Sequence, residues 1–328
     1  MTRVLVCGAV NWDTTCFVTR LPSPGEEVMC TGVSEVSGGT GANVAVAAAR
    51  LLGPGQVTLI AALGTDAIAR RQMEALRSEG VSTSGVSRLH GHQSGHAYIL
   101  VDETGQNVIA SNLGANAALS RRHVSPMRLA SLSEDCRCIA LTDPPLPVAE
   151  AILQSAAKRA IPVLWDPGIL VEHGWQHLGP LMRDVDTLVV NRAEASLLFG
   201  AARPDELQRL VGDNGPEHIV LKLGEEGSVA ISVYGRHMVR VPPLPIEALG
   251  LKVVSSVGCG DVFLGAYASG VSENMDRIEA LLLASAASGY NATRPETRGG
   301  PNREILKRLM DRATRMGFRT EELEHTIE

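Results

Sequence analysis

The feature that most constrains this fold is the alternation of short apolar runs with longer Ala- and Leu-rich segments along most of the chain. Apolar runs that end in turn residues are typical of strands buried in a parallel sheet, and the longer segments are typical of intervening helices. The predicted strands span residues 4–10, 57–62, 138–141, 162–165, 187–190 and 218–221, and the predicted helices 42–52, 67–79, 147–159, 193–199 and 205–211. This order predicts a doubly wound α/β fold, with a mostly parallel central sheet and helices on both faces.

Two regions depart from that order. Residues 16–36 and 95–111 alternate apolar and polar side chains around turns, which is typical of half-exposed antiparallel strands. We expect them to form a small β-sheet lid, made of about residues 14–37 and 91–113, on a single domain that spans residues 1–328. The tail from Arg303 onward is predicted to be a charged amphipathic helix as far as about Thr320.

Composition excludes several classes of protein. The net charge of -6 argues against a nucleic-acid partner, because binding phosphates requires clustered Lys and Arg. The six cysteines include no C-x-x-C pair, so neither a zinc site nor a disulfide framework is expected, and a reducing cytoplasm fits. No uncharged apolar stretch approaches the length of a membrane span, and the first apolar run is too short for a signal peptide. We therefore expect a cytoplasmic protein.

Residues 256–261, SVGCGD, carry the most specific functional signal. Gly258 and Gly260 precede Asp261 directly, and the apolar residues that follow predict the start of a buried helix. Amides at a helix N-terminus can hold an anion, and glycines let a phosphate approach them closely. Because a carboxylate repels a phosphate, Asp261 is better suited to accept a proton from a nucleophile that attacks it. Phosphoryl transfer is the indicated chemistry, and a helix-capping Asp after a Gly turn is the alternative.

Two segments near the N-terminus suit an acceptor rich in hydroxyl groups. Asn11 and Asp13 follow the first strand, where open α/β sheets bind ligands, although an Asx turn is the alternative for this pair. Residues 37–43, SGGTGAN, open a helix whose first turn contains Asn43. This segment fails as a dinucleotide fingerprint, because Val44 stands where the third glycine belongs. Its glycines still allow a ligand to approach the backbone, and a helix start that needs a flexible entry is the alternative.

Two further segments suit a nucleotide. Asn191 could cap a helix with Glu194 completing a capping box, while the same carboxylate could hold magnesium near phosphates, and both roles can coexist. Residues 222–228, KLGEEGS, form a glycine-flanked turn after a strand, which fits a β-hairpin or a nucleotide wall. No G-x-x-x-x-G-K-[ST] occurs, so a P-loop enzyme is excluded.

Together these segments resemble the ribokinase-like (PfkB) family of sugar and nucleoside kinases, from Gly8 to about Pro301. The shared motifs, in family order, are Gly-x-x-Asn-x-Asp at 8–13, the lid turn at 21–26, Gly-Gly-x-Gly-Ala-Asn at 38–43, Gly-Ala-Asn at 114–116, Asn-x-x-Glu at 191–194 and Gly-x-Gly-Asp at 258–261. The resemblance implies transfer of the γ-phosphoryl group of ATP, with Mg²⁺, to a hydroxyl of a small-molecule sugar or nucleoside beneath a β-sheet lid. Lid sheets in this family often pair between subunits, so a homodimer through the lid is expected.

The resemblance also implies residue roles. Asp261 would be the base, and the amides of Gly258, Cys259 and Gly260 would form the anion hole. The residues that would hold the substrate are Asn11, Asp13, Gly39, Asn43 and, by a looser match, Asp143. Glu194 would organise magnesium, and the residues that would line the nucleotide are Asn191, Lys222, Gly224, Gly227 and Ser285.

The sequence departs from the family signature at two positions. Ser255 stands where an Asp usually ligates a monovalent cation, and a neutral hydroxyl is a poorer potassium ligand, so turnover is predicted to be nearly indifferent to potassium. Cys259 replaces the usual Ala and is only slightly larger, so the anion hole is expected to survive.

Three hypotheses cover the acceptor and the activity. The Gly-Gly-Thr-Gly-Ala-Asn form favours ribose or a ribonucleoside, but the aromatic residues that could stack on a base are few: Trp12, Phe17 and Tyr98. A hexose or ketose sugar kinase, fructokinase-like, is the first alternative. A non-catalytic sugar- or nucleotide-binding regulator on the same fold is the second, against which the retained Asp261 argues.

Overall fold

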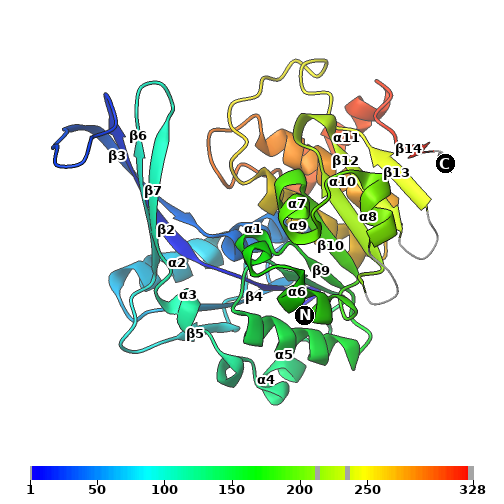
Figure 1. Ribbon diagram of the computed structural model, residues 1–328, viewed down its shortest axis with the longest axis horizontal. Helices are drawn as coiled ribbons and strands as arrows, with labels where there is room; N and C mark the ends of the chain where they lie inside the picture. The colour runs from blue at the N-terminus through cyan, green and yellow to red at the C-terminus, as the bar shows by residue number, and fades with distance from the viewer. Residues whose placement is uncertain (1, 211–214, 233–236, 324–328) are drawn as a thin grey trace.

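The computed structural model describes residues 2–210, 215–232 and 237–323, and it confirms the predicted α/β fold (Figure 1). A ten-stranded sheet has the order β14-β13-β12-β11-β10-β9-β8-β1-β4-β5, and a separate four-stranded sheet has the order β3-β2-β6-β7. The large sheet contains β1 (Val4–Cys7), β4 (Val57–Leu63), β5 (Val86–Arg88), β8 (Cys138–Leu141), β9 (Val163–Trp165), β10 (Thr187–Asn191), β11 (His218–Lys222), β12 (Ser228–Ser232), β13 (His237–Val241) and β14 (Glu321–Leu323).

All six predicted strands are present, as β1, β4, β8, β9, β10 and β11, and neighbouring members pair in parallel. Every residue of β1, β4 and β8 is buried, as expected for strands covered on both faces. Three antiparallel strands, β12 to β14, extend one edge of the sheet. The carboxyl ends of the parallel strands therefore meet along a single edge, where ligands bind in folds of this class.

Helices cover both faces of this sheet. Val4 and Val6 of β1 pack into one core cluster with α1, α2, α9, α10 and α11, whereas Leu5 and Cys7 pack into the other with α3 to α8. The helices are α1 (Thr40–Leu52), α2 (Ala67–Ser78), α3 (Ala115–Ala118), α4 (Pro126–Leu132), α5 (Leu146–Ala157), α6 (Trp175–Met182), α7 (Arg192–Phe199), α8 (Pro204–Leu210), α9 (Cys259–Ser272), α10 (Arg277–Asn291) and α11 (Arg303–Thr314). Short 3-10 turns lie at Arg121–Val124, Gly168–His173 and Gly224–Glu226. Among the residues described, no helix combines the length and apolar character needed to cross a bilayer.

The small sheet is the predicted lid. It rises from one end of the body and consists of β2 (Asn11–Val18), β3 (Cys30–Gly38), β6 (Gly95–Val101) and β7 (Asn107–Asn112) (Figure 1). The two predicted segments supply two hairpins, which join through a parallel pairing of β2 with β6 that the alternation pattern did not predict. Asn11 and Asp13 therefore lie at the root of the lid, beside the carboxyl edge of the large sheet.

Two local predictions are wrong. The first strand ends at Cys7 rather than residue 10, because the chain turns there and Asn11 already pairs within the lid. The C-terminal helix ends at Thr314, since Gly317 adopts a left-handed φ of 88°, and Glu321–Leu323 forms β14 beside β13. Val211 of the predicted helix 205–211 and residues 324–328 of the tail lie outside the described residues.

Candidate active site

The start of α9 forms a cup of backbone donors at the carboxyl edge of the sheet. Gly258 caps the helix with a left-handed φ of 76°, and a Cβ there would lie 2.1 Å from the Thr297 carbonyl oxygen, so only glycine fits. The Cys259 amide donates to the Ser256 carbonyl at 3.3 Å. In the part of the chain that the structure describes, no acceptor is bonded to the amides of Gly258, Gly260 and Asp261, which leaves these three free to bind an anion.

Asp261 lies in the first turn of α9, where Asn43 Nδ2 donates to its Oδ2 at 2.7 Å. Burial raises the pKa of Asp261 to about 7, with the carboxylates of Asp166 and Asp143 acting in the same direction. The Asn43 hydrogen bond and the Lys222 ammonium oppose this rise. A carboxylate with a pKa near neutrality, beside unpaired amides, can take a proton at physiological pH.

Lys222 ends β11 and reaches toward the same cup. Its Nζ lies 3.5 Å from the position of a Cβ on Gly260, and it forms an ion pair with Asp166. Burial lowers the pKa of Lys222, but Asp166 and Glu194 raise it by a larger amount, so the ammonium stays charged. This places a fixed positive charge beside the unpaired amides, where a phosphate would bind.

Asn191 and Glu194 form the predicted capping box of α7. Asn191 Oδ1 accepts from the Glu194 amide at 2.9 Å, and Glu194 Oε2 accepts from the Asn191 amide at 2.7 Å. Burial raises the pKa of Glu194 and the nearby Asp166 raises it further, while the Lys222 ammonium and the Asn191 hydrogen bonds oppose this rise. Within the described ranges no three His, Cys, Asp or Glu side chains converge on a metal position. Mg²⁺ commonly uses one or two carboxylates with phosphates and waters, so Glu194 fits an ion that arrives with a nucleotide.

The predicted acceptor residues meet at the root of the lid. A Cβ on Gly38 would lie 2.1 Å from Asp13 Oδ2, and one on Gly39 would lie 2.6 Å from the Asn11 amide nitrogen, so the two glycines lie against the Asp13 side chain and the Asn11 backbone. Asn116, from α3, donates to Asn11 Oδ1 at 2.9 Å. Burial raises the pKa of Asp13, an effect that Arg298 and His96 oppose.

Asp143 is occupied by local contacts. Its Oδ1 accepts from the Ala9 amide at 3.0 Å, from Thr40 Oγ1 at 2.7 Å and from Thr142 Oγ1 at 2.9 Å. These bonds fasten the first turn of α1 to the loop after β1.

The predicted nucleotide residues lie in and beyond the β11–β12 turn. Gly224 and Gly227 begin and end this turn. The Ser285 hydroxyl donates to the Pro242 carbonyl at 2.6 Å.

Two residues of the site escaped sequence reasoning. Asp166 directly follows β9 at the same sheet edge as Asn191, so the rule that selected Asn191 would have found it. Arg298 lies in the loop before α11, where no pattern indicated that it contacts Asn43, 255 positions earlier.

Comparison with known proteins agrees with this geometry. Residues 1–304 match the family model described as pfkB family carbohydrate kinase. The chain belongs to this family. It is a sugar kinase, an ATP-dependent phosphotransferase that acts on an alcohol group.

Ribokinase from Schizosaccharomyces pombe is 28% identical over 310 residues, which cover 90% of this chain and 93% of that one. The structure of Arabidopsis thaliana ribokinase complexed with ribose and ATP superposes with a TM-score of 0.85 at 26% identity, covering 94% of this pfkB kinase and 99% of that chain. Burkholderia thailandensis nucleoside kinase in complex with inosine has a TM-score of 0.77 at 21% identity, covering 97% and 98%, which shows the shared fold.

Proposed function

We propose that this pfkB kinase transfers the γ-phosphoryl group of ATP to a hydroxyl of ribose. The observation that carries the proposal is Asp261, a carboxylate with a pKa near 7 that lies beside unpaired helix amides and Asn43. The ribokinase relatives support ribose as the acceptor.

The proposed reaction assigns a task to each group around Asp261. Its carboxylate accepts the proton of the attacking hydroxyl, the new oxygen–phosphorus bond forms, and the bond to the β-phosphate oxygen breaks to release ADP. The amides of Gly260 and Asp261, together with Lys222, stabilise negative charge on the transferring group. The Gly258 amide would contribute to the same anion hole, whereas the Cys259 amide is bonded to the Ser256 carbonyl.

The nucleotide side would also hold the metal. Glu194 would bind Mg²⁺ directly or through water, and the ion would neutralise phosphate charge. Asn191, Lys222, Gly224 and Gly227 would line the phosphates and ribose of ATP, and Ser285 would lie near the adenine. The Asp166 carboxylate lies near Glu194, and a second carboxylate beside the first supports a cation there.

The lid favours ribose over a ribonucleoside. Side chains alternate across a strand, so Trp12 lies on the face opposite Asn11 and Asp13. Tyr98 pairs with Thr14 on that opposite face, and its ring stacks on His96 with centroids 4.1 Å apart. Phe17 shares the face of Asp13 but is four residues farther out, about 13 Å along the strand. No aromatic ring among these three candidates is thus placed to stack on a base next to Asp13.

A panel of acceptors tests this assignment. Purified enzyme with ATP and Mg²⁺ would be assayed for ADP release on ribose, hexoses, ketoses, inositol and the common nucleosides, with Asp261→Asn as the blank. We expect the highest kcat/KM on ribose. A nucleoside or a ketohexose that exceeds ribose tenfold would replace it as the substrate, and binding of sugar without any ADP release would favour the regulator hypothesis.

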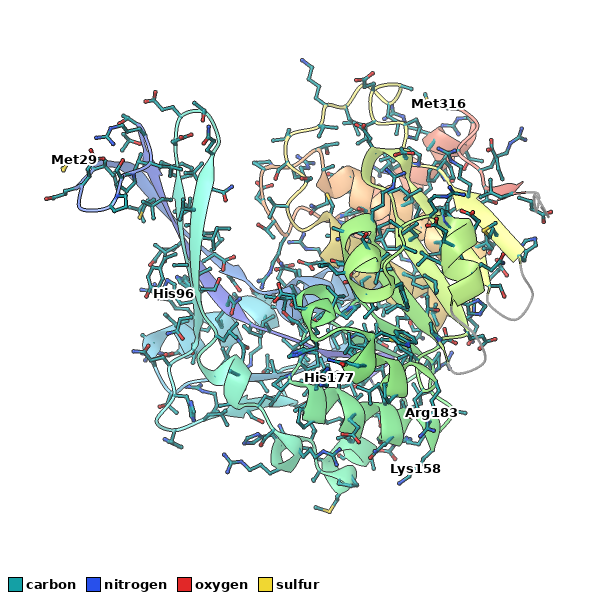
Figure 2. The ribbon with its side chains drawn as sticks, in the orientation of Figure 1. Met29, His96, Lys158, His177, Arg183 and Met316 are labelled. Carbon is teal, nitrogen blue, oxygen red and sulfur yellow. The ribbon has the colours of Figure 1, made fainter. Side chains whose placement is uncertain are left out.

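We also propose that the chain is a single domain that dimerises through its lid, formed by residues 14–37 and 91–113. Figure 2 shows Met29 at the far tip of the lid. The large apolar side chains that the lid exposes are Phe17, Met29, Val33, Val36, Tyr98, Val108, Ile109 and Leu113. An apolar patch of this kind is typical of a protein interface. Light scattering on a gel-filtration column should give a dimer, and Val33→Glu combined with Val108→Glu should give a monomer.

A further inference from the structure

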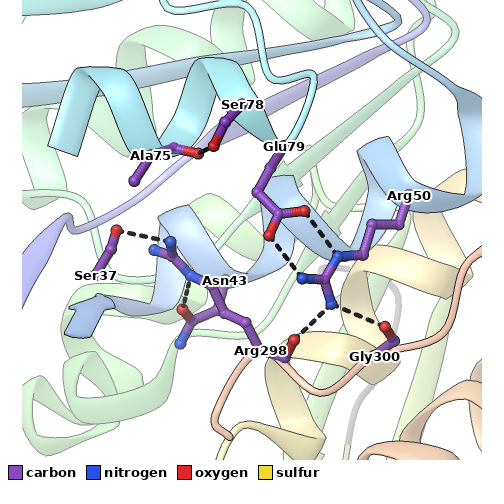
Figure 3. A network of polar contacts seen from close by, with 8 residues as sticks. All are labelled: Ser37, Asn43, Arg50, Ala75, Ser78, Glu79, Arg298 and Gly300. Atoms are coloured by element: carbon purple, nitrogen blue, oxygen red, sulfur yellow. Dashed lines mark hydrogen bonds and ion pairs between the residues drawn. The ribbon is translucent and has the colours of Figure 1, made fainter. Parts of the chain in front are cut away.

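Arg298 is a charged residue at the site for which the proposed reaction has no task. Its guanidinium donates to Asn43 Oδ1 at 2.8 Å and to Ser37 Oγ at 2.7 Å (Figure 3). It also donates to the Gly38 carbonyl at 3.2 Å. All three acceptors are neutral, and none of the ion pairs found among the described residues involves this side chain. Burial lowers the pKa of Arg298 to about 10, so it is still charged at neutral pH. A desolvated cation without a bonded carboxylate is costly, which indicates a role beyond packing.

The backbone of the Arg298 loop is fixed from two sides. Arg50 forms two hydrogen bonds with Glu79 and donates to the carbonyls of Arg298 and Gly300 (Figure 3). On its other side the loop packs on the N-terminus of α9, because the Thr297 carbonyl lies against Gly258. The guanidinium is therefore held at a fixed distance from the start of α9.

The contact with Asn43 determines how that amide faces Asp261. An amide has one oxygen and one NH2 group, and arginine can only donate, so Arg298 selects the Asn43 oxygen. The Asn43 NH2 group then necessarily points to Asp261 Oδ2. This occupies one carboxylate oxygen and leaves Oδ1 for the proton of the acceptor hydroxyl.

The other two contacts reach the lid. Ser37 and Gly38 are the last residues of β3, the strand that enters α1 from the lid. Ser37 Oγ also donates to Gln72 of α2, whose side chain donates in turn to the Asn11 carbonyl. One guanidinium thus contacts both the root of the lid and the amide that binds the base.

We propose that Arg298 is a positioning residue that orients Asp261 through Asn43 and fastens the root of the lid to this base. The proposal rests on the proposed kinase function and assigns Arg298 no contact with substrate.

A role of this kind changes the pH dependence of turnover. The charged groups that face Asp261 come from four elements: Lys222 ends β11, Asp166 follows β9, Asp143 follows β8 and Arg298 precedes α11. Without Arg298, Lys222 is the one cation left among these groups, and the Asn43 amide is free to turn. The carboxylate form of Asp261 then loses stabilisation, so its pKa rises.

The test compares Arg298→Met and Arg298→Lys with the matched control Arg294→Met. Arg294 lies in the same loop but bonds to the Tyr290 hydroxyl, away from Asn43. We expect Arg298→Met to lower kcat about 30-fold and to move the acid limb of the kcat profile upward by about one pH unit. Arg298→Lys keeps the positive charge, so it should return the acid limb to its wild-type pH. It should recover only part of kcat, because an ammonium lacks the planar guanidinium that donates to several acceptors at once. Arg294→Met should stay within about twofold of wild type. If Arg298→Met does not fold, Arg298→Gln takes its place in the test: glutamine is neutral, but its side-chain NH2 group can still donate a hydrogen bond.

A titration independent of turnover separates this proposal from the proposed function. Carboxyl ¹³C NMR, with the Asp261 signal assigned by its loss in Asp261→Asn, should give a higher pKa in Arg298→Met than in wild type. An active wild type with an unchanged profile and an unchanged carboxyl pKa in the variant would overturn the inference and leave the kinase proposal standing. A wild type inactive on every acceptor would overturn the kinase proposal, and the NMR shift alone would then decide whether Arg298 positions Asp261.

Discussion

The acceptor side and the nucleotide side of the site, which meet at Asp261, are built from different interactions. On the acceptor side, hydrogen bonds join segments far apart in sequence, such as Asn116 to Asn11 and Arg298 to Asn43. On the nucleotide side, Lys222 forms an ion pair with Asp166, beside the capping carboxylate of Glu194. A network of directional hydrogen bonds defines the position of one small neutral molecule, whereas clustered charges suit a polyphosphate with its cation. Substitutions on the two sides should therefore separate in kinetics.

Asp261→Asn tests the point where the two sides meet, and it should have the largest effect. Loss of the base acts on the transition state, so kcat should fall by about 10²-fold or more, while both KM values stay within about threefold. Steady-state assays in which ribose and ATP are varied in turn measure kcat, KM for ribose and KM for ATP. Turnover within a few-fold of wild type would mean that another group accepts the proton.

Lys222→Met tests the nucleotide side. Loss of the ammonium leaves Asp166 unpaired next to the phosphate position, so KM for ATP should rise about 30-fold, while KM for ribose changes little. Lys222→Arg keeps the charge and serves as the control. An equal rise in the KM values for ATP and for ribose would mean that the nucleotide side and the acceptor side do not bind their ligands independently.

Asp13→Asn makes the converse test. The carboxylate that we assign to a sugar hydroxyl is replaced by an isosteric amide, so KM for ribose should rise about 20-fold with KM for ATP unchanged. Isothermal titration of ribose into the nucleotide-free enzyme gives the same comparison without catalysis. Unaltered ribose affinity would remove Asp13 from the acceptor site.

The pH dependence should follow the raised pKa of Asp261. Burial disfavours the carboxylate, so this group is protonated below about pH 7 and active as a base above it. The rate should therefore rise about tenfold from pH 6 to pH 8, since one group with a pKa near 7 goes from about one-tenth to nine-tenths deprotonated. An acid limb near pH 4 would contradict the environment described for Asp261.

Potassium should have the smallest effect. The hydroxyl of Ser255 accepts from the Val257 amide at 3.2 Å and offers no carboxylate to a cation. Replacing potassium with tetramethylammonium at constant ionic strength should change kcat by less than about twofold. The variant Ser255→Asp restores the usual family residue, and it should become more dependent on potassium than wild type.

Sequence reasoning succeeded where one physical signal dominated. The six parallel strands were predictable because each is mostly apolar, and the lid because its strands alternate. The edge strands β5 and β14 and the neighbouring strand β13 were missed. β5 has only three residues, β13 carries mixed residues, and the charged tail that contains β14 has a helical pattern until Gly317 interrupts it.

Sequence patterns predicted which residues lie close together in the site, but they did not predict the hydrogen bonds between them. Glycine-rich motifs place Asn43 and Asp261 at the starts of two helices, yet their 2.7 Å contact depends on how α1 packs against α9, across 218 positions. Arg298 illustrates the limit, because an arginine in a Gly-rich loop gives no sign of its partners until the tertiary structure fixes the loop.

The parallel pairing of β2 with β6 has a consequence for how the chain folds. Asn11 pairs with Gly95, and the intervening residues build α1, β4, α2 and β5 of the body. Closing a loop of roughly 80 residues is entropically expensive unless the intervening segment is already compact. During synthesis, β2 has only β3 as a lid neighbour until residue 95 leaves the ribosome. The lid therefore forms after the first part of the body, and kinase activity in a refolding experiment should appear later than helical circular dichroism.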